Sequence, residues 1–115
     1  MKEINNVIKY KDNEYKIVFN LNVMEQIQDE YGTLDKWGKL TDGTEGEPNI
    51  KALIFGFTCM INEGIEIDND ENGTDNKPFT NKQIGRLIQE VGLEEMTRVL
   101  TSTVTASTQS AEKIA

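Results

Sequence analysis

The sequence predicts a small α+β domain in which an N-terminal β-hairpin packs against a bundle of about four α-helices. Three observations lead to this fold class. Apolar and polar residues alternate over residues 4–19, apolar residues then recur at helical spacing, and cap residues and glycines mark the helix ends. The chain has 115 residues, which fits one domain. We expect a single domain over residues 1–105 and a flexible tail over residues 106–115.

Residues 4–19 have the pattern of two paired strands. The polar run Lys11-Asp12-Asn13-Glu14 supplies turn-forming residues between them. The period of two suits a sheet that is covered on one face. Because an isolated hairpin is only marginally stable in water, we expect this one to pack on helices. Val7 is expected on the uncovered face, and the covered face is expected to carry Ile4, Ile8, Tyr10, Tyr15, Ile17 and Phe19.

The first helix is predicted to begin at Asn22 and to end at Gly32. Asn22 can accept a hydrogen bond from an unpaired backbone N–H, and Glu25 completes the pattern of a capping box. Gly32 suits the left-handed conformation that ends many helices. Residues 33–37 predict a further turn or short helix. The side chains expected to face inward are Leu21, Met24, Ile27 and Tyr31.

A second major helix is predicted over residues 49–62, where apolar residues occur on nearly all sides. Such a helix belongs in the centre of a domain. Gly56 destabilises a helix by about 1 kcal/mol relative to Ala, so we expect it to permit close packing. Residues 41–48 and 64–79 are expected to be irregular, since both are polar and contain glycine. The apolar residues are Ile50, Leu53, Ile54 and Phe57 on one side, and Ala52, Phe55 and Cys59 on another.

Two more helices are predicted in the last third of the chain. Thr80 and Gln83 form a capping-box pattern at the start of the first, and Gly92 ends it. The second begins near Leu93. Its Thr and Ser residues beyond position 101 compete for backbone hydrogen bonds, so we expect it to fray there. The inward-facing residues are predicted to be Ile84, Leu87, Ile88, Val91, Met96, Val99, Leu100 and Val104.

The charge of the chain argues against nucleic acid or a membrane surface as a partner. The formal net charge is −8, from 20 acidic and 12 basic residues, and the basic residues are scattered. Binding to phosphate or to anionic lipid depends on clustered cations. No apolar run approaches the roughly 18 residues of a membrane span, and the N-terminus lacks the apolar segment of a signal peptide. We therefore expect a cytoplasmic protein.

Few residues could support catalysis. The chain has no histidine and a single cysteine, Cys59, within an apolar run. Catalysis by Ser-His-Asp or Cys-His arrangements and zinc sites that need imidazole are excluded. The carboxylate pairs at residues 29–30 and 94–95 are adjacent in predicted helices, so their side chains point apart. We expect neither enzymatic activity nor a cofactor.

One motif suggests calcium. Residues 68–73, Asp-Asn-Asp-Glu-Asn-Gly, match the beginning of an EF-hand loop, with Asp68, Asp70 and Asn72 as weak candidate ligands. The match is incomplete, because the twelfth position holds Phe79 in place of a bidentate Glu. A small calcium-binding module that uses the loop at residues 68–76 is therefore an alternative function.

Three aromatic residues are candidate contacts for a protein partner, since aromatic side chains carry much of the energy of interfaces. They are Tyr31, Trp37 and Phe79. The alternative for Tyr31 and Trp37 is that they cover the edge of the core. Phe79 precedes the Thr80 cap, where a hydrophobic staple with Ile84 is the alternative.

Four local patterns together resemble a known family. They are Tyr15 in the second strand, the F-x-L-N run Phe19-Asn20-Leu21-Asn22, the helix end Glu30-Tyr31-Gly32, and the late segment Gly92-Leu93-Glu94-Glu95. In this layout, from about Val7 to Leu100, the chain resembles the tail assembly chaperones of long-tailed phages and prophages of Gram-positive bacteria. The acidic segment at residues 68–76 is not part of the family pattern.

The resemblance implies a role without catalysis. Such chaperones bind the tape-measure protein and keep it soluble until the tail-tube protein polymerises around it, and they are absent from the mature virion. Many exist in two forms, the longer made by a ribosomal frameshift, and a Thr/Ser-rich C-terminus would suit that junction. The expected partners are therefore the tape-measure and tail-tube proteins, with self-association on the same surface left open. A structural head–tail connector or tail completion protein is the nearest alternative.

Overall fold

The computed structural model describes the backbone of residues 6–42 and 46–114 and the side chains of residues 7–42 and 46–105. Within these residues the predicted α+β class is confirmed, because a two-stranded antiparallel hairpin precedes five helices. Ile4, predicted for the first strand, lies outside the described part. The elements are β1 (Asn6–Tyr10), β2 (Asn13–Ile17), α1 (Leu21–Tyr31), α2 (Leu34–Thr41), α3 (Ile50–Asn72), α4 (Asn81–Val91) and α5 (Leu93–Ile114).

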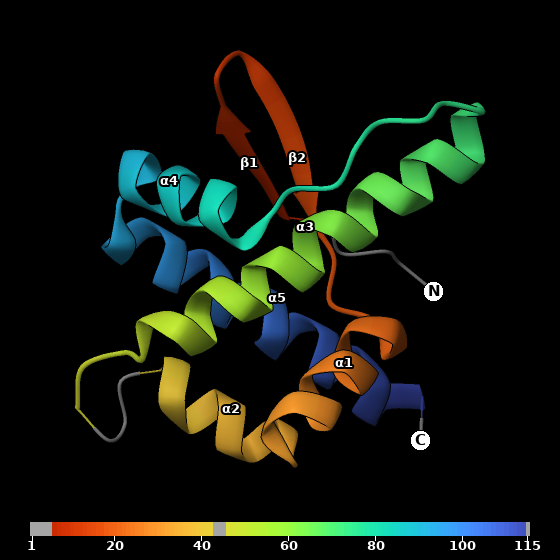
Figure 1. The fold of residues 1–115 in the computed structure, drawn as a ribbon. Helices are drawn as coiled ribbons and strands as arrows, with labels where there is room; N and C mark the ends of the chain where they lie inside the picture. Colours follow the sequence, from red (N-terminus) through yellow and green to blue (C-terminus); the bar gives the residue numbers. More distant parts are fainter. Residues whose placement is uncertain (1–5, 43–45, 115) are drawn as a thin grey trace.

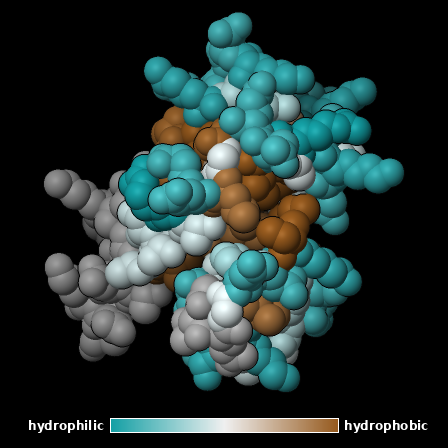
Figure 2. Space-filling model, turned by 90° about the vertical axis from the view of Figure 1, so that its left-hand side faces the viewer, coloured by the Kyte–Doolittle hydropathy of each residue, from teal (hydrophilic) through white to brown (hydrophobic). Residues whose placement is uncertain are grey.

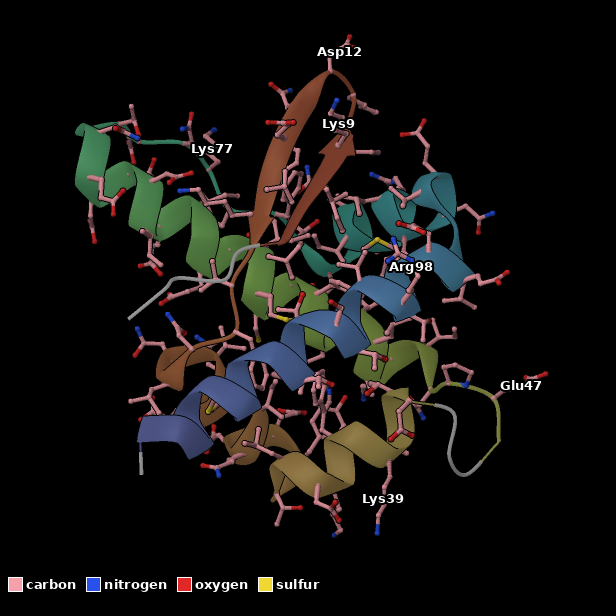
Figure 3. The ribbon with its side chains drawn as sticks, turned by 180° about the vertical axis from the view of Figure 1, so that it is seen from behind. Lys9, Asp12, Lys39, Glu47, Lys77 and Arg98 are labelled. Atoms are coloured by element: carbon pink, nitrogen blue, oxygen red, sulfur yellow. The ribbon has the colours of Figure 1, made fainter. Side chains whose placement is uncertain are left out.

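Helix α3 crosses the centre of the molecule (Figure 1). The hairpin lies on one side of it, α1 and α2 lie on the other, and α4 lies alongside its first half. Helix α5 runs behind α3 in Figure 1 and in front of it when the molecule is turned round (Figure 3). No described helix combines the length and the apolar character that a membrane span requires.

The hairpin pairs in the register that places Ile8 opposite Tyr15. Its two-residue turn holds Lys11 and Asp12 at φ 50° and φ 65°, the left-handed geometry that matches the twist of paired strands. The predicted faces are confirmed: Ile8 and Ile17 are buried, whereas Val7 is 48% exposed. The covered face therefore lies against the helices, which a marginal two-stranded sheet requires.

Four other elements, β2, α1, α2 and α4, pack against α3, and the buried residues of α3 include two glycines. A Cβ atom added at Gly56 would lie 2.4 Å from Cζ2 of Trp37 on α2, and one added at Gly64 would lie 2.9 Å from the backbone oxygen of Lys16 on β2. Both contacts are closer than any side chain permits. The expectation that Gly56 permits close packing is therefore confirmed, and Gly64 does the same for the hairpin.

The prediction that residues 64–79 are irregular is wrong for its first half. Helix α3 continues to Asn72, and Gly73 ends it in the left-handed conformation at φ 65°. The segment is polar because this part of α3 projects beyond the core, with residues 70–73 exposed. Two asparagines of α3 then hold the chain that follows. Asn69 bonds the backbone N–H and the carbonyl of Asn76, and Asn62 bonds those of Phe79.

The start of α1 also differs from its prediction. Asn20, not Asn22, is the N-cap, and its side chain accepts a bond from the Val23 backbone N–H at 3.1 Å. The helix is therefore rotated relative to the predicted one: Leu21 is 79% exposed, and Val23 is buried with Ile27. The amides of Asn20 and Asn22 both donate to Oε2 of Glu63, at 2.7 and 3.0 Å. This buried carboxylate fastens α1 to α3.

The C-terminal helices follow their predictions more closely. Thr80 and Gln83 form the capping box, and α4 buries Ile84, Leu87 and Ile88. Met96, Val99 and Leu100 of α5 are buried as expected. The backbone of α5 is helical to Ile114, whereas the sequence predicts fraying beyond residue 101 and a flexible tail over residues 106–115. The buried Thr103 hydroxyl donates to the Val99 carbonyl at 2.8 Å, which satisfies it within the helix.

Replacing Gly56 by alanine should destabilise the protein, because the new methyl group would overlap the Trp37 ring. We expect the free energy of unfolding to fall by about 1–3 kcal/mol in a urea titration. Gly38→Ala is the matched control, since it lies within α2 with nothing within 4 Å. There alanine should raise stability by up to about 1 kcal/mol. Equal effects at the two positions would contradict the close-packing argument.

Replacing Glu63 by alanine should leave the amides of Asn20 and Asn22 without their acceptor. Hydrogen bonds to a charged group contribute about 1.5–3 kcal/mol, and a loss of this size is expected in the free energy of unfolding of Glu63→Ala. Glu66→Ala, at an exposed site on the same helix, should change stability by less than about 0.5 kcal/mol. A Glu63→Ala protein as stable as Glu66→Ala would rule out the clamp between α1 and α3.

Candidate partner-binding site

An apolar groove lies where the end of α1, the first half of α3 and the start of α4 meet. We call it the α1/α3/α4 groove. Its volume is about 650 Å³, and most of its lining surface is apolar. Its apolar residues are Tyr31, Ile50, Ile54, Phe55 and Gly85, and its polar ones are Glu30, Lys51, Asn81 and Lys82.

Helix α3 forms the floor of the groove. Ile50 and Ile54 are one helical turn apart, so they lie on the same face. Ile50 is the more open of the two and is 50% exposed. Gly85 of α4 faces Ile54, since a Cβ atom there would lie 3.6 Å from the Ile54 Cδ1 atom. A methyl group there would make an ordinary van der Waals contact, so α4 already lies beside the floor at normal packing distance.

The end of α1 forms one wall. Gly32 stops the helix with φ 90°, which leaves Tyr31 in its last turn. The Tyr31 ring meets Phe55 edge to face, with their centroids 5.6 Å apart. Burial, and then the negative charge of Glu30, raise the pKa of the Tyr31 hydroxyl above its usual value. Tyr31 therefore presents a neutral phenol at the rim.

The charged residues of the groove are exposed. Lys51 lies in the first turn of α3, Lys82 in the first turn of α4, and Glu30 near the end of α1. Neither lysine has an ion-pair partner among the described residues. The groove thus joins an apolar floor to a rim with two free ammonium groups and one carboxylate.

Figure 2 shows the side of the molecule that carries α4 and the beginnings of α3 and α5. Apolar side chains gather there between hydrophilic ones. Another groove, more open and larger at about 830 Å³, is lined by Pro48 and the first turns of α5, including Leu93, which is 41% exposed. Apolar surface of this kind, bordered by polar residues, is typical of protein-interaction sites.

The structure places the three predicted aromatic contacts in different surroundings. Tyr31 lies in the groove. Trp37 is only 2% exposed; its ring stacks on Phe19, and its indole N–H donates to the Ala52 carbonyl at 3.0 Å. Trp37 is therefore a core residue and no surface contact. Phe79 is half-buried against Tyr15, with ring centroids 5.0 Å apart, and fixes the hairpin beside the start of α4.

The sequence predicts that most of the apolar groove residues belong to the core. Ile50, Ile54 and Phe55 were expected to be buried, because α3 is apolar on nearly all sides. The sequence does contain one indication of the groove, which is the large number of apolar residues in α3. A helix with four short neighbouring elements has more apolar residues than those elements can cover. Which ones remain open depends on how far α1 and α4 extend along α3, and the sequence does not state this.

The predicted calcium loop does not exist as a loop. Asp68, Asp70 and Asn72 belong to helix α3, where alternate residues diverge around the axis. Asp68 pairs with Lys16 of β2 at 3.0 Å, and Asp70 and Asn72 are exposed. The described residues contain no group of three or more His, Cys, Asp or Glu side chains placed to hold a metal ion.

Comparisons with protein-family models, with curated proteins and with solved structures found no match for this chain.

The Cys59 thiol should react slowly in the folded protein. It is 9% exposed, and burial raises its pKa from 9.0 to about 11. Only the thiolate is nucleophilic, so at pH 8 this shift alone lowers the alkylation rate by roughly two orders of magnitude. We expect slow labelling by iodoacetamide in buffer and ordinary labelling in denaturant, followed by mass spectrometry. Fast labelling of the folded chain would contradict the buried position.

Proposed function

We propose that this protein is a phage tail assembly chaperone that acts by covering apolar surface on another protein. The observation that carries the proposal is the α1/α3/α4 groove, an open apolar channel formed by three helices. The sequence patterns from Tyr15 to Gly32 and at Gly92 support the family. The proposed clients are the tape-measure protein and, at handover, the tail-tube protein.

The physical basis is burial of an amphipathic helix in a groove. A long helical protein exposes apolar stripes before its own assembly partners arrive, and such a stripe can lie against Ile50 and Ile54 with Tyr31 at its side. The net charge of −8 keeps the chaperone and its complexes soluble. One small groove gives modest affinity, so many copies along one client would bind through avidity and still release when tube subunits compete.

Four asparagines of the described fold, Asn20, Asn22, Asn62 and Asn69, have structural roles that do not require a ligand. The asparagines at the start of α1 and at the end of α3 hold helix ends and linkers. This favours a role based on surface burial over a calcium-binding module. The proposed protein works in the cytoplasm of an infected or lysogenic bacterium.

A structural head–tail connector or tail completion protein is the nearest alternative. A component of that kind stays in the particle, whereas a chaperone leaves. Mass spectrometry of purified virions discriminates between the two, since the chaperone proposal expects the protein in the lysate and its absence from the particles. Stoichiometric presence in finished virions would overturn the proposal.

Co-expression with the candidate tape-measure protein tests the groove directly. Wild-type chain should raise the soluble fraction of the client, and Ile50→Asp should remove most of that effect, since a charge on the floor disfavours apolar burial. Leu21→Asp is the matched control. Both residues are exposed aliphatics at the first position of a helix, but Leu21 lies outside the groove. No gain in client solubility, or equal loss with both variants, would contradict the proposal.

A further inference from the structure

We propose that the α1/α3/α4 groove selects amphipathic helices whose apolar stripe is flanked by acidic side chains. This inference rests on the proposed function, which says only that the groove buries apolar helix surface. The inference adds that the bound client helix is acidic. This is the opposite of what the net negative charge of the whole chain would favour. A chain of net charge −8 should on average repel an acidic client.

The first argument is the local balance of charge. The lining holds Lys51 and Lys82 against the single carboxylate of Glu30, so the groove is net positive within an acidic protein. Neither ammonium group is neutralised by a carboxylate of the described residues. At physiological ionic strength charges are screened beyond about 8 Å, so a helix in the groove senses its rim more than the distant acidic surface.

The second argument is the direction of the helices. Lys51 and Lys82 each lie in the first turn of a helix, where the backbone contributes a partial positive charge. Only α1 ends at the groove and contributes the opposite sign. Lysine in a first turn is disfavoured by this dipole, and two such lysines beside one apolar channel suit an anionic partner.

The geometry also sets the client pattern. The floor residues Ile50 and Ile54 repeat at one helical turn, and Tyr31 and Phe55 border them. A helix lying along this floor needs apolar residues at i, i+3, i+4 and i+7. The residues on either side of its apolar stripe then lie near the ammonium groups of Lys51 and Lys82. A glutamate or aspartate at such a position can form an ion pair with them. An interface between two copies of this chain is the competing occupant.

The test uses the full chain and two fluorescent helical peptides. Both carry leucine at i, i+3, i+4 and i+7; one has glutamate on its flanks and the other lysine. Fluorescence anisotropy should show the acidic peptide binding about threefold to tenfold more tightly, the range expected of one or two exposed ion pairs. The preference should shrink in high salt.

Charge reversal at the rim supplies the decisive comparison. The double variant K51E/K82E should reverse the preference, and glutamate is well tolerated in a first helical turn. The control K9E/K77E has the same net charge but changes exposed lysines on β1 and on the segment after α3 (Figure 3). It should keep the wild-type preference. Tighter binding of the basic peptide by wild type, or equal shifts in both variants, would overturn the inference.

The outcomes separate this inference from the proposed function. Equal binding of both peptides, lost in Ile50→Asp, would overturn the charge preference and leave the groove as a helix-binding site. Binding of neither peptide would overturn the inference, while the co-expression assay decides the function independently. Sedimentation of wild-type chain as a dimer that Ile50→Asp dissociates would assign the groove to a second copy, and would also overturn it.

Discussion

Direct approach of two elements to the backbone of α3 is the constraint on which the rest of the structure depends. Gly56 admits the Trp37 ring, and Gly64 admits the backbone of β2. With the ring seated, its indole N–H reaches the Ala52 carbonyl and its face stacks on Phe19. A helix that lacks side chains at two points can thus pack directly against four other elements, β2, α1, α2 and α4. A larger residue at either point would push α2 or the hairpin outward and open the core.

The same constraint explains why the groove exists. Helix α2 and the hairpin pack directly against α3 at Gly56 and Gly64, and the short helices α1 and α4 remain to cover the face that carries Ile50 and Ile54. Each of those helices has 11 residues, whereas α3 has 23. The uncovered surplus is the floor of the groove. Binding surface here is a consequence of unequal helix lengths around a central axis.

Sequence reasoning predicted the elements that rest on local chemistry. The hairpin alternation, the Thr80 capping box and the glycine ends of α1 and α4 each depend on neighbouring residues. It failed where a distant residue decides the outcome. Asn20 and not Asn22 caps α1, and Glu63, more than 40 positions away, fixes the amides of both asparagines. The polarity of the Asp/Asn-rich end of α3 predicts a loop, because the sequence alone does not show the linker that this end of the helix anchors. Trp37 was an open choice for the same reason, since its pocket comes from α3.

The two asparagine contacts after α3 have a further consequence. The side chain of Asn69 is hydrogen-bonded to the backbone of Asn76, and that of Asn62 to the backbone of Phe79. The linker between α3 and α4 therefore runs back along α3 and is attached to it at two points. Seven residues of helix advance about 10.5 Å, and three residues of extended chain cover about 10 Å. The linker between residues 76 and 79 is therefore close to fully extended. Pro78 restricts it further, because proline favours extended backbone at the residue before it. The length of this linker therefore fixes the position of α4. With one residue fewer, the linker could not make both asparagine contacts, and with one more it would hold the start of α4 less firmly.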